Sequence, residues 1–105
     1  MAASSRPKVL WSLAAEEDLI SVWMYVARQA SETIADDQLR AIGRVSEAIG
    51  EWPLAGRGRD ETLAGLRSIP ASPYVIFFRP KSGGVEILRV LHERRDIDAI
   101  FSATA

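Results

Sequence analysis

Apolar residues in the first half of the chain recur at helical spacing in two consecutive segments. Residues 8–12 form a short β-like run that ends in Ser12, a residue type that can cap a helix. From 13 to 29 the apolar positions fall three or four residues apart, which predicts a helix. A second helix is predicted to begin after Ser31 and to end at the Gly and Trp-Pro signals of 50–53. Because one or two residues separate these helices, we expect an antiparallel hairpin.

The second half of the chain consists of β-rich runs separated by turn signals. Residues 53–65 are rich in glycine and arginine, show no regular period, and are predicted to form a loop. Strands are predicted over 66–70, 74–79 and 85–92, with a turn at 80–84 that contains a proline and two glycines. The order is β-α-α-β-β-β. This predicts an α+β fold with the helical hairpin packed on one face of a small, mainly antiparallel sheet.

Both faces of the predicted sheet are apolar. Side chains of neighbouring strand residues point to opposite faces, and strict alternation gives each face an apolar set from the last two strands. One hairpin covers one face, so we expect part of the second face to be covered by a terminus, a second copy or a different chain. The alternative is that residues 53–65 fold under the sheet. The residues that we assign to this second face are Val75, Phe77, Leu88 and Val90.

The composition is typical of one reduced globular domain. The chain has 105 residues, of which 48% are hydrophobic and 26% are charged. The absence of cysteine excludes disulfides and thiolate metal sites, and a single histidine argues against structural zinc. No apolar run has the length of a membrane helix, and the first residues do not resemble a signal peptide. We expect a cytoplasmic domain over 8–101 without cofactor or metal, between a flexible tail at 1–7 and a short tail at 102–105.

Charge is unevenly distributed along the chain. Residues 16–51 hold eight acids and three arginines, whereas the remaining residues hold ten bases and six acids. Eleven of the thirteen bases are arginine, whose planar guanidinium suits carboxylates and phosphates. The second half therefore indicates an anionic partner, the alternative being an ordinary solvated surface. The candidate anion-binding residues are Arg57, Arg59 and Arg67.

Four segments of the chain, in this order, resemble the ParE toxins of the RelE/ParE superfamily of bacterial toxin–antitoxin modules. "VLWSLAAEEDL" is similar to the opening strand and helix start of that family, and "IGEWPLAGRGRDE" to the segment after its second helix. "LRSIPASPYVIFFR" and "VEILRVLHERRD" are similar to its later strands, the last ending in His-x-x-Arg-Asp. The resemblance covers about residues 8–98. It implies a βααβββ toxin, a ParD-like antitoxin encoded beside it that covers the second sheet face, and a role in plasmid stabilisation.

Two modes of action follow from this resemblance. RelE-type toxins cut messenger RNA on the ribosome, which requires a base, an acid and cations around the phosphate. ParE-type toxins bind and inhibit DNA gyrase without making or breaking a bond. This chain has arginines and His92, which could serve such a reaction. It lacks two features that RelE-type sites share, because residues 53–70 contain no lysine and no tyrosine follows His92. We expect no catalytic residue and a gyrase inhibitor, with a RelE-type endoribonuclease as the alternative and an inactive antitoxin ligand or co-repressor as the third.

The end of the last predicted strand holds the candidate target-binding residues. The motif match to ParE toxins implies this role for four residues, and adjacent strand side chains diverge, so at least one of the two neighbouring arginines faces outward. The structural alternative is that Asp96 pairs with Arg95 or Arg67 and that His92 hydrogen-bonds a loop carbonyl. The four residues are His92, Arg94, Arg95 and Asp96.

Overall fold

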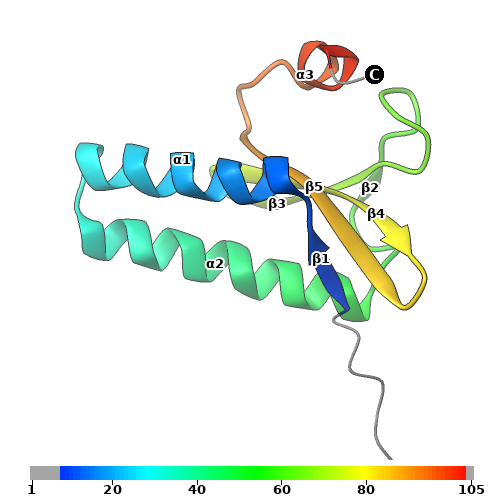
Figure 1. The fold of residues 1–105 in the computed structure, drawn as a ribbon, viewed down its shortest axis with the longest axis horizontal. Coiled ribbons are helices and arrows are strands. Elements are labelled where there is room, and N and C mark those ends of the chain that lie inside the picture. Colours follow the sequence, from blue (N-terminus) through cyan, green and yellow to red (C-terminus); the bar gives the residue numbers. More distant parts are fainter. Residues whose placement is uncertain (1–7, 104–105) are drawn as a thin grey trace, which may run out of the picture.

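The computed structural model describes residues 8–103, so the tail expected at 1–7 lies outside the described residues, as do residues 104 and 105. The described chain contains three helices and five strands (Figure 1). No helix among these residues is long and apolar enough to cross a membrane. In chain order the elements are β1 (Val9–Trp11), α1 (Leu13–Gln29), α2 (Glu32–Glu51), β2 (Arg57–Gly58), β3 (Arg67–Ala71), β4 (Tyr74–Lys81), β5 (Gly84–His92) and α3 (Ile97–Ala103).

The strands form one mixed sheet in the order β1-β5-β4-β3-β2. β1 pairs with β5 in parallel, and all the other pairs are antiparallel. The helices α1 and α2 run side by side, and side chains of both pack in one cluster with side chains of β3, β4 and β5 (Figure 1). The predicted α+β fold, a helical hairpin on a mainly antiparallel sheet, is therefore confirmed.

The two helices begin at the serines that the sequence indicates. Ser12 and Ser31 have extended backbones, and their hydroxyl oxygens accept hydrogen bonds from the N–H groups of Ala15 and Ile34. Such caps bind an amide that has no partner within the first turn. The second helix ends at Trp52, immediately before proline. These local signals fix both helices and the short connection between them.

The segment 53–65, predicted to be a loop, contains a fifth strand. β2 is two residues long and pairs antiparallel with β3, so that Arg57 lies opposite Ser68 and Gly58 opposite Arg67. Two residues are too few to show a period in the sequence. The pairing depends on the neighbouring strand, which places β2 at the edge of the sheet.

A β-bulge changes the predicted assignment of side chains to the two faces. Phe77 lies opposite Arg89 and Phe78 opposite Ile87, so Leu88 is an extra residue in β5. Beyond this bulge the alternation is inverted, and Val90 lies in the cluster beneath the helices rather than on the second face. The assignment of Val90 to the second face was wrong for this reason.

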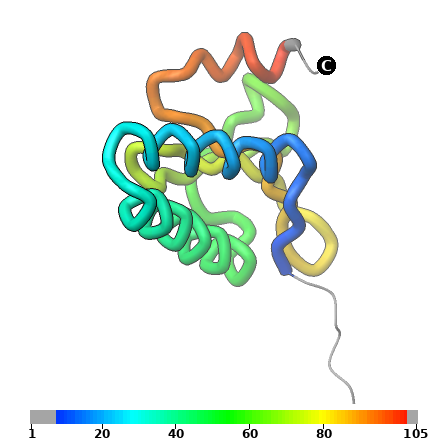
Figure 2. Tube along the Cα trace, turned by 60° about the vertical axis from the view of Figure 1, so that its left-hand side comes forward, coloured from blue at the N-terminus to red at the C-terminus, as the bar shows by residue number. Residues whose placement is uncertain are grey.

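The second face of the sheet is covered by the chain itself. α3 lies beside the segment that precedes β3 (Figure 2), and side chains of both pack on this face. The hydroxyl of Thr62 donates to Asp98 at 2.8 Å. Two of the expected possibilities therefore occur together, because the C-terminal segment and part of residues 53–65 both cover this face, and it is this chain rather than an antitoxin that closes it. Residues 102–103 belong to a helix rather than a tail. This second cluster consists of the buried residues Leu66, Phe77, Leu91 and Phe101, with Leu63, Val75, Leu88, Ile97 and Ile100 packed against them.

Two glycines provide a matched test of the close approach between β1 and β5. A Cβ at Gly84 would overlap the carbonyl group of Lys8, whereas a Cβ at Gly43 in α2 meets no atom within 4 Å. We expect Gly84→Ala to lower the free energy of unfolding by more than about 2 kcal/mol. We expect Gly43→Ala to raise it by about 0.5–1 kcal/mol, because alanine favours a helix interior. Urea denaturation measures both, and a stable Gly84→Ala variant would contradict the parallel pairing of β1.

Candidate target-binding groove

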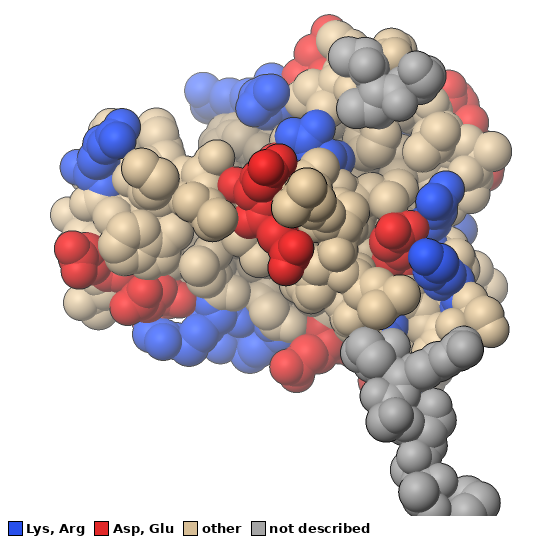
Figure 3. All heavy atoms as spheres, viewed as in Figure 1, with Lys and Arg blue, Asp and Glu red and all other residues tan. Residues whose placement is uncertain are grey.

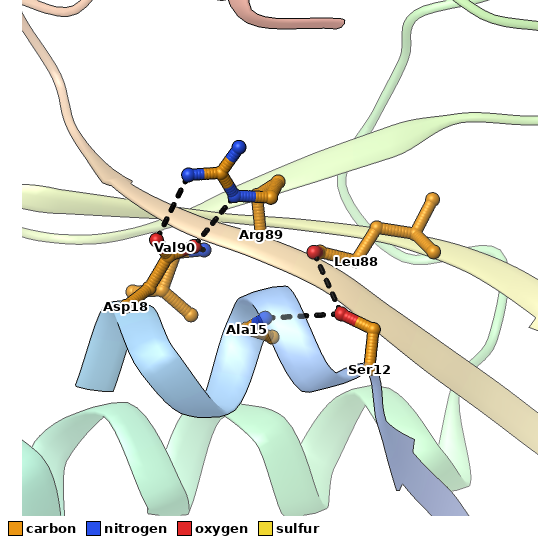
Figure 4. A network of polar contacts seen from close by, with 6 residues as sticks. All are labelled: Ser12, Ala15, Asp18, Leu88, Arg89 and Val90. Atoms are coloured by element: carbon orange, nitrogen blue, oxygen red, sulfur yellow. Dashed lines mark hydrogen bonds and ion pairs between the residues drawn. The ribbon is translucent and has the colours of Figure 1, made fainter. Parts of the chain in front are cut away.

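The shortness of β1 leaves one edge of the second half of β5 without a neighbouring strand, while the other edge pairs with β4. β1 pairs only with residues 85–87 of β5. Beyond that point side chains of α1 bind the exposed backbone edge (Figure 4). The hydroxyl of Ser12 donates to the carbonyl oxygen of Leu88 at 2.9 Å, and Asp18 Oδ2 accepts from the N–H of Val90 at 2.9 Å. These contacts satisfy strand groups that would otherwise face solvent or another strand.

The same carboxylate of Asp18 forms a two-point ion pair with Arg89. Arg89 Nε lies 2.8 Å from Asp18 Oδ2, and Arg89 Nη2 lies 2.9 Å from Asp18 Oδ1. The side chains are 13% exposed for the acid and 21% for the arginine. The hydrogen bond to Asp18 raises the pKa of Arg89 against the opposing effect of burial. α1 is thereby held to β5 by a permanent charge pair.

A groove of about 620 Å³ lies between α1 and this free half of β5. Its lining includes the buried apolar residues Val22, Val90 and Leu91, and two tyrosines. In Figure 3 basic side chains gather at the edge of a hollow between α1 and the chain that leads to α3. The groove therefore combines apolar lining with a positively charged rim. Its full lining is Asp18, Ser21, Val22, Tyr25, Tyr74, Arg89, Val90, Leu91, His92, Arg94 and Arg95.

Three of the four predicted target-binding residues, His92, Arg94 and Arg95, line this groove. His92 Nδ1 accepts a hydrogen bond from the backbone N–H of Arg94 at 3.1 Å, and its ring meets Tyr74 edge-on at 5.6 Å. Because Nδ1 is an acceptor, the proton of the neutral imidazole is on Nε2. The side chains of Arg94 and Arg95 are exposed and, among the residues that the structure describes, form no hydrogen bond or ion pair.

Asp96 has a different place from the other three residues. Its Oδ1 accepts from the N–H of Ala99 at 3.2 Å, which caps the start of α3. This cap, followed by apolar residues at 97, 100 and 101, is a helix signal that sequence reasoning missed. Asp96 therefore fixes where the chain turns after β5, and it does not line the groove.

The three candidate anion-binding arginines do not converge on one site. Arg67 donates to the carbonyl oxygens of residues 54, 55 and 56. Arg59 donates through Nε to the Ser68 hydroxyl, and its guanidinium carbon lies 5.9 Å from the centre of the Phe77 ring. Arg57 is exposed on β2. Two of the three guanidiniums thus bind groups of the chain itself.

The residues assigned to antitoxin contact are largely interior. Phe77 is 1% exposed and meets Phe101 of α3 edge-on at 5.5 Å. Val75 and Leu88 are half-buried in the same cluster, and Val90 is buried beneath the helices. Phe77 is covered by α3, and Val90 belongs to the other cluster and lines the groove, so these four residues do not form one accessible surface.

Of the four groove side chains that can exchange a proton, Asp18, Tyr25, Tyr74 and His92, Tyr74 is the one that burial changes most clearly. Burial raises the pKa of the Tyr74 phenol, and the neighbouring Tyr25 raises it further, so Tyr74 remains a neutral phenol at neutral pH. Residues 8–103 contain no group of three or more side chains that could hold a metal ion. The arrangement is suited to binding an anionic, partly apolar surface. Sequence reasoning missed Tyr25 and Asp18, because their place beside β5 depends on packing.

Asp18 offers a direct test of how the groove is held in shape. We expect Asp18→Ala to lower the free energy of unfolding by about 2 kcal/mol, because it leaves Arg89 and the Val90 amide without their partner. Asp37→Ala is the matched control, since its pair with Arg40 is about 60% exposed and should change stability by less than about 0.5 kcal/mol. Urea denaturation compares the two variants. Equal losses of unfolding free energy in the two variants would contradict the conclusion that Asp18 holds α1 to β5.

Comparison with known proteins identifies the family. Residues 9–97 match the family described as "ParE toxin of type II toxin-antitoxin system, parDE". "Toxin ParE1" of Mycobacterium tuberculosis is 29% identical over 92 residues, which are 87% of this chain and 94% of that protein. "Toxin RelE2" of Caulobacter vibrioides is 31% identical over 88 residues, which are 84% of this chain and 97% of that protein.

A solved structure supports the fold independently. It is described as "Chromosomal ParDE TA system from P. aeruginosa", and it superposes with a TM-score of 0.70 at 21% identity, covering 80% of this chain and 92% of that one. The resemblance seen in the sequence is therefore confirmed. The chain belongs to the ParE toxin family of type II toxin–antitoxin systems.

Proposed function

We propose that this ParE-family toxin acts in the cytoplasm by binding and inhibiting DNA gyrase, and that a ParD-like antitoxin neutralises it. The family membership supports the toxin role and an antitoxin partner. The toxin makes and breaks no covalent bond in this proposal. Its gene pair would serve plasmid or locus stabilisation, because cells that lose the antitoxin are exposed to the remaining toxin.

The observation that carries the proposal is the groove with its two arginines, which have no partner among the residues that the structure describes. Arg94 and Arg95 project beside an apolar floor, and a guanidinium that has no partner of its own is available to a carboxylate of another protein. Arginine and tyrosine are enriched among residues that dominate protein interfaces. We assign direct contact with the target to His92, Arg94 and Arg95, and to Asp96 the support of this contact by fixing the start of α3.

A second candidate function is cleavage of messenger RNA. The specific observation in its favour is the 31% identity to a protein named Toxin RelE2. The groups available here are less suited to it, because Tyr74 is held neutral at a buried strand position and Phe101 packs in the second cluster. A reaction at phosphate needs a base for the attacking hydroxyl and an acid for the leaving oxygen.

One pair of assays separates these functions. Purified toxin should inhibit supercoiling by DNA gyrase and leave ribosome-bound message intact. Cut message with unaffected gyrase would favour the ribonuclease. Neither effect, together with tight antitoxin binding, would mean that this chain is an inactive antitoxin ligand or a co-repressor component.

The role of the rim is tested by Arg94→Ala/Arg95→Ala. We expect the concentration needed for half-inhibition of gyrase to rise at least about tenfold, because each arginine supplies a charge-assisted contact. Arg28→Ala/Arg44→Ala is the control with the same loss of charge, at exposed helix positions outside the groove, and should inhibit like the wild type. Thermal unfolding should be unchanged in both. A lower midpoint of thermal unfolding in the Arg94→Ala/Arg95→Ala variant alone would mean that these arginines stabilise the fold.

A further inference from the structure

α1 is apolar on two opposite sides. Ala15 and Val22 lie in the core beneath it. On the opposite side, three large apolar residues are exposed to solvent: Leu13 at 71%, Ile20 at 61% and Met24 at 46%. Their separations of seven and four residues place them on one line along the helix, since 3.6 residues form a turn. We call these three residues the outer stripe.

The part of the chain that contains the outer stripe holds most of the exposed large apolar side chains among the described residues. Eight large hydrophobic residues are exposed there, and five of them lie in β1 and α1. Apolar side chains aligned along one helix face favour contact with another apolar surface, because their burial removes them from water. The five are Leu10, Leu13, Ile20, Met24 and Tyr25.

The charge beside the outer stripe is acidic over its first two turns, and the exposed Arg28 lies four residues beyond Met24 at its other end. Glu16 and Glu17 are exposed, and at 100° per residue they lie on either side of the line through the stripe. From Leu13 to Ala27 the helix contains no lysine or arginine. Figure 3 shows acidic side chains among apolar ones on this side of the molecule, where α1 lies in front. A complementary partner therefore carries apolar residues flanked by basic ones.

We propose that the outer stripe of α1 is the docking surface for an amphipathic helix of the antitoxin, with lysine or arginine on both flanks of its apolar face. This inference rests on the antitoxin partner of the proposed function, and it replaces the second sheet face as the expected antitoxin contact. A second copy of this chain fits the surface poorly. Two copies of the stripe would bring Glu16 and Glu17 of each chain toward a seam to which residues 13–27 of neither chain supply a base.

The outer stripe and the target-binding groove lie on different sides of α1. The groove is lined by Asp18, Val22 and Tyr25, none of which belongs to the stripe. Substitutions at the stripe should therefore change antitoxin binding without changing the contact with the target.

The test is Ile20→Lys in the full-length toxin, with binding to the purified antitoxin encoded beside it measured by calorimetry. The substitution removes an apolar contact and places a positive charge opposite the basic flanks. We expect the dissociation constant to rise at least about tenfold. Gln29→Lys is the matched control, because it adds the same charge at an exposed position of the same helix away from the stripe, and should bind like the wild type. Circular dichroism should show equal helix content in all three proteins.

The outcomes separate this inference from the proposed function. Unchanged antitoxin binding by Ile20→Lys would overturn the docking surface, while gyrase inhibition by the wild type would still stand. Lost antitoxin binding by this variant, with no gyrase inhibition by the wild type, would support the docking surface on α1. It would overturn the proposal that DNA gyrase is the target. A toxin that dimerises alone and becomes monomeric on Ile20→Lys would overturn the inference in favour of a second copy. Weaker binding of Glu16→Lys/Glu17→Lys, with a salt dependence smaller than that of the wild type, would support the predicted basic flanks.

Discussion

The contact of Asp18 with Arg89 and with the amide of Val90 is the interaction on which the candidate groove depends. It joins α1 to the part of β5 that β1 is too short to cover. The carboxylate serves as a partner for a strand amide and for a guanidinium at the same time. An unpaired strand edge commonly attracts another chain. Here the helix binds that edge through side chains, which leaves a groove instead of a continuous sheet.

The two faces of the sheet are closed by different means. α1 and α2 cover one face, and α3 with the segment before β3 covers the other. The bulge at Leu88 gives each face an apolar side chain near the end of β5, because Val90 then points toward the helices α1 and α2 and Leu91 toward α3. A short helix that is capped by its own Asp96 thus takes a position that an antitoxin was expected to occupy. The remaining apolar surface lies on the outer side of α1, where acidic residues flank it.

The groove combines an apolar floor with a basic rim, a combination suited to the recognition of another protein. Arg94 and Arg95 project from the end of β5 without a partner among the described residues, while the nearby Tyr74 is a buried, neutral phenol. Other arginines already have a role within the chain: Arg67 binds loop carbonyls and Arg59 stands over Phe77. Charge alone therefore does not single out the candidate residues. The rim pair combines two features: among the described residues no group binds their guanidiniums, and both side chains line the groove.

The sequence by itself determined the helical hairpin, three of the strands that follow it, and the gathering of His92, Arg94 and Arg95 at one place. These features depend on local signals: serine caps, helical periods, and a motif whose residues are neighbours in the chain. The tertiary structure decided the two-residue strand β2, the bulge at Leu88, the packing of α3 on the second face, and the groove beside Asp18 and Tyr25. Each of these depends on contacts between residues far apart in the sequence. A strand of two residues or a single extra residue leaves no period to detect, and the place of α3 depends on an apolar face that exists only once β4 and β5 have paired.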